Sequence, residues 1–304
     1  MLSEKGQFFK SWLYQNVKAA PAAKTVAAAR ERLEQLAAPH IPEGVAIEAV
    51  RANGVNGEWV RAGQTVAGKV VVYCHGGGYI MGNAKTARGL AVILSQATNC
   101  SVFSLDYRLA PEHPFPAALD DARAAYRWLL ETGNPAENIV FCGDSAGGGL
   151  ALAALTALRD AGEKLPAGAV LITPWLDLAG TGDSRKTKQA RDPWYNPESI
   201  ELQAARFYAG ANAVTNPLIS PLYADLAGLP PILIQAAGDD TLVDDATRLY
   251  EKGKESGVDM TLEQWDEMWH VWHHFALQVP EAQEAVAKLG RFVQEKLGLL
   301  RRSQ

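Results

Sequence analysis

The chain has 304 residues, of which 48% are hydrophobic, and its formal net charge is −5. This length and apolar content suffice for one compact unit with a buried core. The acidic balance excludes a nucleic-acid-binding protein, which would need a basic face. No run of about 18 apolar residues occurs, so we expect no transmembrane helix and no stable membrane insertion.

The first 24 residues carry charges and lack the continuous apolar segment of a signal peptide, so we expect a cytoplasmic protein. Residues at helical spacing in this segment form an apolar stripe, and residues 25–38 repeat the pattern. The stripe consists of Phe8, Phe9, Trp12, Leu13 and Val17. Such helices can bind a membrane surface.

Two Asn-Gly pairs, at 53–54 and 56–57, predict the turns of a hairpin-like region. From Lys69 onward, strand and helix patterns alternate, which predicts an α/β protein with a mostly parallel central sheet flanked by helices. We expect strands near 69–74, 101–105, 138–142, 167–173, 231–237 and 259–265. The alternation breaks once, between Leu178 and Pro217, and long inserts of this kind are often lids.

The first expected strand of this series runs directly into His75-Gly76-Gly77-Gly78. Consecutive glycines let the backbone approach a substrate closely, and backbone N–H groups can stabilise the oxyanion of acyl transfer. A phosphate-binding loop would need Lys and Ser or Thr behind the glycines. Because Tyr79 and two apolar residues follow instead, we interpret the segment as an oxyanion loop.

Residues 143–147 read Gly-Asp-Ser-Ala-Gly, between an apolar run at 138–142 and a helix-like stretch at 148–161. A strand, Gly-x-Ser-x-Gly and a helix form the context of a nucleophile elbow. The elbow presents its serine, here Ser145, to a base on one side and to backbone donors on the other. The alternatives are an ordinary Gly-rich turn and a nucleophilic Cys142, but Cys142 lies in the strand before the turn.

A triad with this elbow needs an acid and then a base further along the chain. The strand near 231–237 ends in Asp239 and Asp240, at the rim where α/β enzymes place their chemistry. The base must come from His270, His273 or His274, which are the histidines beyond Ser145. The order predicts Ser145, then Asp239 or Asp240, then His270.

Two metal sites are conceivable in this region, and we expect neither. Asp239, Asp240, Asp244 and Asp245 could gather a divalent cation, but hard cations usually need more oxygen ligands. We expect Asp244 or Asp245 to cap the helix that follows. His270 and His274 would share a helical face, but the HExxH pattern of zinc enzymes is absent, so we interpret His273 and His274 as surface or supporting residues.

The combined motifs resemble the hormone-sensitive-lipase-like family of α/β-hydrolases, in particular its bacterial carboxylesterases. The matching segments, in the order of that family, are 75–79, 106–118, 143–148, 240–244 and His270. The resemblance implies that Ser145 is the nucleophile, Asp240 the acid and His270 the base. It also implies that the backbone N–H groups of Gly77, Gly78 and Ala146 form the oxyanion hole, with His75 and Gly76 in the same motif.

One departure from the family is visible beside the acid. The family usually has proline after this aspartate, and here Thr241 follows, which frees φ and loosens the loop. The departure leaves Asp239 as an alternative, whereas the spacing to Leu242 and Asp244 favours Asp240.

The resemblance also implies a domain division and a set of pocket residues. N-terminal cap helices would span 1–45, the hydrolase core 46–178 and 217–304, and a cap insert 179–216. The candidate pocket residues, each of which could equally pack on the core, are Tyr79, Trp194, Tyr195, Phe207, Tyr208 and Trp272.

The function predicted on this basis is hydrolysis of carboxylic esters through an acyl-enzyme, with short to medium acyl chains preferred. We expect a small ester as the binding partner, no cofactor, no metal and no nucleic acid, and the family makes a homodimer possible. Fold and triad do not fix the substrate, so a lactone, carbamate or amide hydrolase is the alternative. A second alternative is a non-catalytic receptor of the same fold, but the complete triad argues against it.

Overall fold

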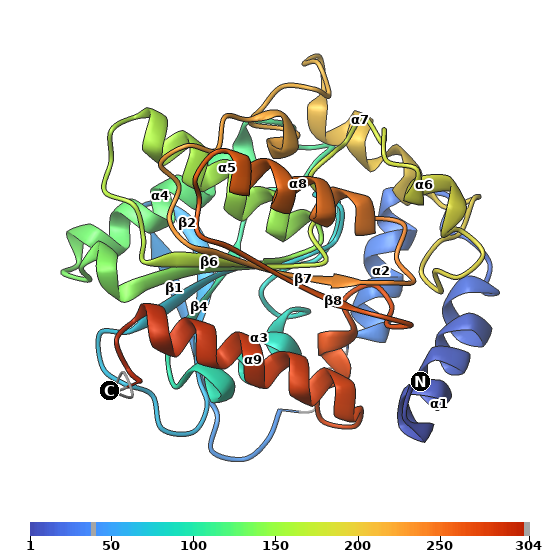
Figure 1. Ribbon diagram of the computed structural model, residues 1–304, viewed down its shortest axis with the longest axis horizontal. Helices are drawn as coiled ribbons and strands as arrows, with labels where there is room; N and C mark the ends of the chain where they lie inside the picture. Colours follow the sequence, from blue (N-terminus) through green and yellow to red (C-terminus); the bar gives the residue numbers. More distant parts are fainter. Residues whose placement is uncertain (38–40, 301–304) are drawn as a thin grey trace.

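The computed structural model describes residues 1–37 and 41–300, and its described part contains an eight-stranded sheet in the order β1-β2-β4-β3-β5-β6-β7-β8 (Figure 1). The strands are β1 (Ala46–Ala52), β2 (Val55–Arg61), β3 (Val70–Cys74), β4 (Ser101–Asp106), β5 (Ile139–Asp144), β6 (Gly168–Ile172), β7 (Ile232–Ala237) and β8 (Met260–Trp265). The first two pair antiparallel, β2 pairs antiparallel with β4, and all later neighbours are parallel. The predicted mostly parallel sheet and its six strands are confirmed.

Only one of the two Asn-Gly pairs makes the hairpin turn. Asn53 and Gly54 connect β1 to β2, whereas Asn56 and Gly57 lie inside β2 and pair with β4, so the second predicted turn is wrong. A Cβ on Gly57 would lie 2.7 Å from a ring carbon of Phe103. The glycine therefore marks a close approach between two strands.

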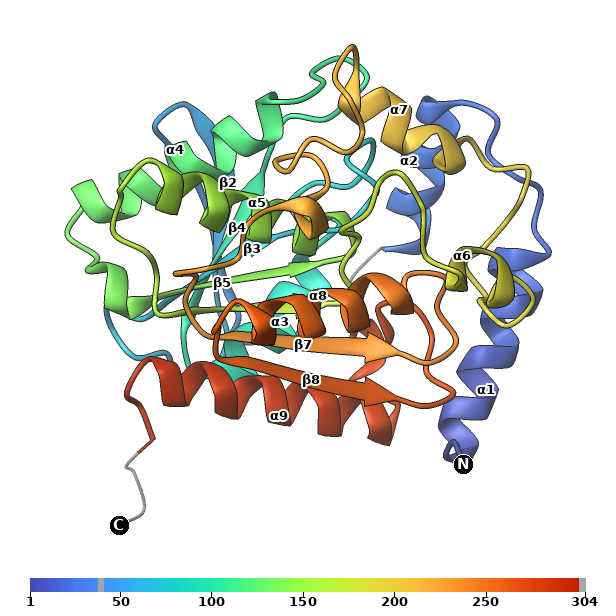
Figure 2. The ribbon, with the colours of Figure 1, turned by 45° about the horizontal axis from the view of Figure 1, so that its top comes forward.

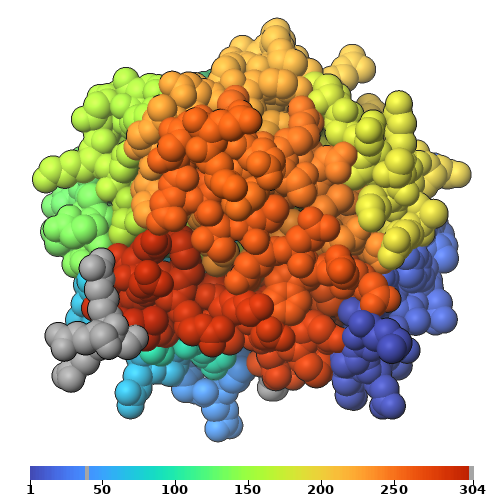
Figure 3. Space-filling model, viewed as in Figure 1, coloured from blue at the N-terminus to red at the C-terminus, as the bar shows by residue number. Residues whose placement is uncertain are grey.

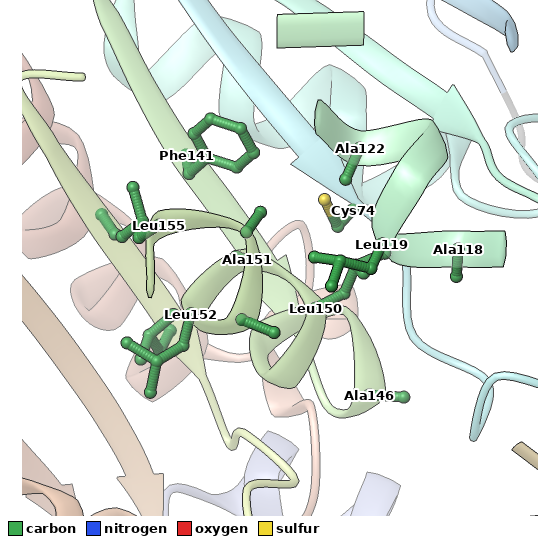
Figure 4. Close-up of a cluster of buried hydrophobic side chains, with 14 of the residues drawn as sticks. Cys74, Ala118, Leu119, Ala122, Phe141, Ala146, Leu150, Ala151, Leu152 and Leu155 are labelled. Atoms are coloured by element: carbon green, nitrogen blue, oxygen red, sulfur yellow. The ribbon is translucent and has the colours of Figure 1, made fainter. Parts of the chain in front are cut away.

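Helices cover both faces of the sheet, as the βαβ pattern predicts. In Figure 1, α4 (Ala117–Glu131), α5 (Ala146–Asp160) and α8 (Val243–Glu255) lie on one face, and α3 (Arg88–Thr98) and α9 (Pro280–Lys296) lie on the other. Helix α5 is buried over almost its whole length, because it packs on β3, β5 and β6 and has α4 beside it in the same layer. Figure 4 shows Leu150 and Ala151 of α5 beside Leu119 of α4 and Phe141 of β5.

The N-terminal segment comprises α1 (Glu4–Leu13), the π-helix η1 (Tyr14–Lys18) and α2 (Val26–Leu36). Its apolar stripe is divided: Leu13 and Val17 are buried, Phe9 packs against Phe275, and Phe8 and Trp12 are exposed. No helix within the described ranges has the length and apolar character needed to span a membrane.

The insert between β6 and β7 contains α6 (Ser184–Thr187), the 3-10 helix η3 (Ile200–Gln203) and α7 (Ala204–Ala209), before the 3-10 helix η4 (Pro221–Tyr223). It contacts the N-terminal segment, since Lys18 Nζ donates to the Asp192 carbonyl at 2.7 Å and Ile200 N–H donates to the Ala23 carbonyl at 2.9 Å. Figures 2 and 3 show the two segments side by side, and Figure 2 shows α1 beyond the carboxyl ends of β7 and β8.

Candidate active site

Ser145 lies between β5 and α5 in a backbone conformation that a non-glycine residue rarely adopts, with φ 53° and ψ −122°. Such a conformation costs on the order of 1–3 kcal/mol and persists only where neighbours enforce it. The Ser145 N–H donates to the Ile172 carbonyl, and the Ser145 carbonyl accepts from Trp175 N–H, both at 2.9 Å. The strand–turn–helix context expected for a nucleophile elbow is therefore present.

Close approaches of the backbone require both glycines of the elbow. Strands β3 and β5 pair so that Cys74 lies opposite Gly143. A Cβ on Gly147 would lie 2.0 Å from the Cys74 carbonyl oxygen, and a Cβ on Gly143 would lie 2.2 Å from the Gly147 oxygen. A side chain at Gly147 would therefore push the elbow away from the end of β3, and one at Gly143 would force the two ends of the elbow apart.

Asp144 joins the same two motifs through its side chain, a connection the sequence analysis missed. Its buried Oδ1 accepts from the Gly76 N–H at 2.9 Å and from the Tyr73 hydroxyl at 2.6 Å. Burial and the nearby Asp144 charge raise the pKa of Tyr73, so the phenol keeps the proton that it donates. Asp144 therefore fixes the start of the glycine loop relative to Ser145.

The glycine loop itself turns sharply after β3. Gly77 has φ +116° and Gly78 has φ +62°, both in the region that favours glycine. The Gly77 carbonyl accepts from the Ile80 and Met81 N–H groups. Within the described residues, the N–H groups of Gly77 and Gly78 donate to no protein acceptor.

His75 is a packing residue of this loop. Its ring stacks on Tyr107 with centroids 4.2 Å apart, and its Nδ1 lies 2.6 Å from the Gly76 carbonyl oxygen. Burial lowers the pKa of His75, which favours the neutral ring. His75 thus supports the loop by packing, and the backbone N–H groups of the loop are the candidates for an oxyanion hole.

Asp240 and His270 meet beyond the carboxyl ends of β7 and β8. Asp240 Oδ2 lies 2.8 Å from His270 Nδ1, and Asp240 Oδ1 accepts from the Leu242 N–H at 2.8 Å. Asp240 is 1% exposed, and the His270 side chain is 17% exposed. Burial lowers the pKa of His270, but the Asp240 charge, the hydrogen bond to it, and the charges of Asp192 and Asp144 outweigh burial and raise that pKa overall.

Asp239 points to different partners. It forms ion pairs with Lys10 Nζ at 2.5 Å and with Arg191 Nε at 2.7 Å. These partners come from α1 and from the insert, whereas His270 pairs with Asp240. The geometry therefore favours Asp240 over Asp239 as the partner of the histidine.

The other two C-terminal histidines differ sharply in environment. His273 is fully buried, with Nε2 2.7 Å from Gln235 Oε1, and burial lowers its pKa to about 3, so it is a neutral core residue and not a surface one. His274 is exposed. His270 and His274 do not share an α-helical face, because Val271 has φ 49° and a short 3-10 helix, η5 (Trp272–Phe275), follows.

Asp244 and Asp245 do not cap α8, as the sequence analysis expected; both lie inside its first turn. Asp244 accepts from the Ser184 N–H, and Asp245 accepts from the Leu176 and Asp177 N–H groups. Asp244 thus holds the insert to α8, and Asp245 holds the loop after β6 to it. Among the residues that the structure describes, no group of three metal-ligating side chains is placed to hold a metal ion.

Cys142 lies in β5 and is almost fully buried, and Cys74 and Cys100 are also buried free thiols. Burial raises the pKa of Cys142 well above its ordinary value. A buried thiol of this kind is inert, so the structure excludes Cys142 as the nucleophile.

The candidate pocket aromatics fall into two groups. Tyr79 and Tyr208 stack on each other with centroids 3.7 Å apart and are buried, as is Trp272, so these three side chains pack in the core. The other three, which lie in the insert and are partly exposed, are Trp194, Tyr195 and Phe207. A pocket role for any of the six stays a prediction.

Comparison with known proteins identifies the class. Residues 71–274 match the family described as alpha/beta hydrolase fold. An acetyl-hydrolase of Streptomyces hygroscopicus is 43% identical over 258 residues, which cover 85% of each chain. A solved esterase from the bacterial hormone-sensitive lipase family is 42% identical, with a TM-score of 0.93 over 98% of this chain and 99% of the other. A structure of EstE5, soaked with p-nitrophenyl butyrate, is 40% identical, with a TM-score of 0.93 over 97% and 99%.

The chain therefore belongs to the bacterial hormone-sensitive-lipase family of α/β-hydrolases, and it is a serine esterase of that family. The resemblance inferred from the motifs is confirmed.

Proposed function

We propose that Ser145, His270 and Asp240 are the catalytic triad of this esterase. His270 Nε2 takes the proton of Ser145 Oγ as that oxygen attacks the ester carbonyl carbon. Asp240 holds the ring through Nδ1 and stabilises the imidazolium. The alcohol leaves with the proton from His270, and water then attacks the acyl-enzyme with His270 as base, which releases the acid and restores Ser145.

The observation that carries this proposal is the 2.8 Å contact between His270 Nδ1 and the buried Asp240 carboxylate. It places a charged acceptor on one ring nitrogen and leaves the other for the nucleophile. The strained Ser145 and the free Gly77 and Gly78 N–H groups support the same mechanism. These two N–H groups and that of Ala146 would stabilise the oxyanion, and losing one such donor typically costs about 3 kcal/mol.

We infer that residues 1–45 and 179–216 act together as a cap over the hydrolase core at 46–178 and 217–304. Hydrogen bonds between Lys18 and the insert, and between Ile200 and Ala23, support one joint cover. Trp194, Tyr195 and Phe207 would give it apolar walls. Such a bounded site favours short to medium acyl esters, in keeping with the acetyl-hydrolase relative and with the p-nitrophenyl butyrate soaked into EstE5.

The proposal is tested by labelling and turnover together. Phenylmethylsulfonyl fluoride, which is present in an EstE5 structure, should modify Ser145 in the wild type, and Ser145→Ala should lose both label and turnover. The loss can reach about a millionfold for a triad nucleophile. An adduct on any other residue, located by mass spectrometry, contradicts the assignment.

A substrate panel then decides the class of bond. p-Nitrophenyl esters of increasing acyl length, a lactone and an anilide should rank with the short to medium esters first. Apolar pockets discriminate between substrates that differ by one methylene by roughly 1–3 kcal/mol. Faster hydrolysis of the lactone or the anilide would show that the same triad serves another bond.

A further inference from the structure

Asp192, which lies between α6 and η3, reaches the loop that carries Asp240. Its carboxylate is 2% exposed, and Oδ2 accepts one hydrogen bond from the Thr241 backbone N–H at 3.0 Å and another from Thr241 Oγ1 at 2.9 Å. Oδ1 accepts from the Trp194 N–H at 2.9 Å. These three hydrogen bonds hold the carboxylate in one orientation, and each is stronger when the carboxylate is ionised.

The position of Thr241 makes this contact relevant to the triad. Thr241 separates Asp240 from Leu242, whose N–H donates to the Asp240 carboxylate. The Leu242 N–H of this loop thus orients the Asp240 carboxylate, and Asp192 of the insert holds the loop in place. We propose that Asp192 is a positioning residue of the triad, which keeps the Asp240 carboxylate aligned with His270 through its two hydrogen bonds to Thr241. This inference rests on the triad proposed above.

The support for Asp192 extends into the N-terminal segment. Lys18 Nζ donates to the carbonyl oxygens of Asp192 at 2.7 Å and of Ala190 at 3.0 Å. On the other side of Asp240, Asp239 is paired with Lys10 and Arg191. Both neighbours of Asp240 are therefore held by the segments that we assign to the cap, which makes the alignment of the acid depend on the cap being in place.

Asp192 also adds a second buried carboxylate near the histidine. Its burial, and then the Asp240 charge, raise the pKa of Asp192, and the charges of Asp240 and Asp192 both raise the pKa of His270. An imidazolium forms at His270 as Ser145 attacks. When ionised, Asp192 therefore favours the charge that develops during the reaction.

The central test is Thr241→Val, which keeps the shape of the side chain and the backbone N–H and removes only the hydroxyl donor. We expect kcat for p-nitrophenyl butyrate to fall about tenfold, which corresponds to about 1.4 kcal/mol in the barrier. KM should stay within about twofold, because the contact acts on the reacting groups and not on substrate binding. Thr241→Ser keeps the hydroxyl and should retain the wild-type kcat.

Asp192→Asn tests the contact from the other side and should also lower kcat. If the two residues act through one contact, kcat of the double variant will be no lower than kcat of the less active single variant. Thr181→Val is the matched control, because Thr181 of the insert donates through Oγ1 to another buried carboxylate, that of Asp177, at 2.6 Å and does not contact Asp192 or Thr241 through a hydrogen bond. It should leave kcat unchanged.

A measurement without substrate keeps this inference separate from the proposed activity. The proton on His270 Nδ1 should give a low-field NMR resonance, which is assigned by its loss in His270→Gln. We expect this resonance to shift in Thr241→Val and Asp192→Asn but not in Thr181→Val. A wild type without esterase turnover overturns the proposed function, while the resonance still reports on the contact.

Three results overturn the inference. The first is wild-type kcat and an unshifted resonance in both Thr241→Val and Asp192→Asn. The second is a rise in KM with kcat unchanged, which would make Asp192 a determinant of substrate binding. The third is an equal loss of kcat in Thr181→Val, which would mean that any loosening of the insert has this effect.

Discussion

His273 should make the protein acid-sensitive, because it is buried in its neutral form. Its pKa is about 3 in the folded protein, against an ordinary value of 6.5, and burial is the main cause. Below pH 6.5 the unfolded chain binds a proton at this residue that the folded protein does not bind. Stability is therefore unaffected above pH 6.5 and falls as the pH drops from 6.5 toward 3.

The size of the effect follows from the shift, since one pKa unit corresponds to 1.36 kcal/mol. The full shift amounts to about 5 kcal/mol, and about 3 kcal/mol of it is lost between pH 7 and pH 4. His273→Gln removes the titration and keeps an N–H group that can donate to Gln235 Oε1, the partner of the native ring. The variant loses packing against Trp272 at every pH.

The assay is urea unfolding followed by tryptophan fluorescence at pH 7 and pH 4. The free energy of unfolding of the wild type relative to His273→Gln should fall by about 3 kcal/mol between these values. His113→Gln, on an exposed loop, is the matched control and should not reproduce the change. If the wild type and His273→Gln differ in free energy of unfolding by the same amount at both pH values, the reasoning is refuted.

The remaining predictions concern the proposed triad and one buried acid. Asp240→Asn should lower kcat about 10⁴-fold by favouring the wrong imidazole tautomer. Asp239→Asn should mainly lower the melting temperature, because it weakens the ion pairs with Lys10 and Arg191. A larger loss of kcat in Asp239→Asn than in Asp240→Asn contradicts the assignment. His270→Ala should abolish turnover and His274→Ala should retain most of it. Burial raises the pKa of Asp245 from its ordinary value of 3.8 to about 6, so stability falls as the pH rises from 3.8 toward 6 and levels off above 6. Asp245→Asn should therefore gain about 2 kcal/mol relative to the wild type between pH 4 and pH 7 in chemical unfolding.

The sequence predicted those parts of the fold and site that depend on local patterns. The six strands from β3 to β8 follow from apolar runs that alternate with helical patterns along the chain. The carboxyl ends of these parallel strands bring Ser145, Asp240 and His270 to one edge of the sheet. The nucleophile elbow was predictable because its strand, its Gly-x-Ser-x-Gly pattern and its helix follow one another in the chain. In each case, the signal lies within a few residues of the feature.

Contacts between distant segments left no such signal. Asp144 touches Gly76 and Tyr73 only because β3 and β5 are neighbours in the sheet. The Asn-Gly pair at 56–57 matched a turn, although the glycine serves the approach of Phe103 from β4. His273 carried no pattern that distinguishes a core histidine from an exposed one, because burial there depends on the packing of η5 against Gln235 of β7.

Thr241 shows how the same residue changes meaning once its surroundings are known. From the sequence, a threonine after the acid, where the family usually has proline, frees a backbone angle and loosens the loop. In the structure, the N–H that proline lacks and the Thr241 hydroxyl both donate to Asp192. The restraint that a proline ring would place on the loop is thus replaced by hydrogen bonds to Asp192, which depend on the insert. The restraint can therefore be lost without any change to the triad residues, so the rate of the chemical step should respond to substitutions in the cap.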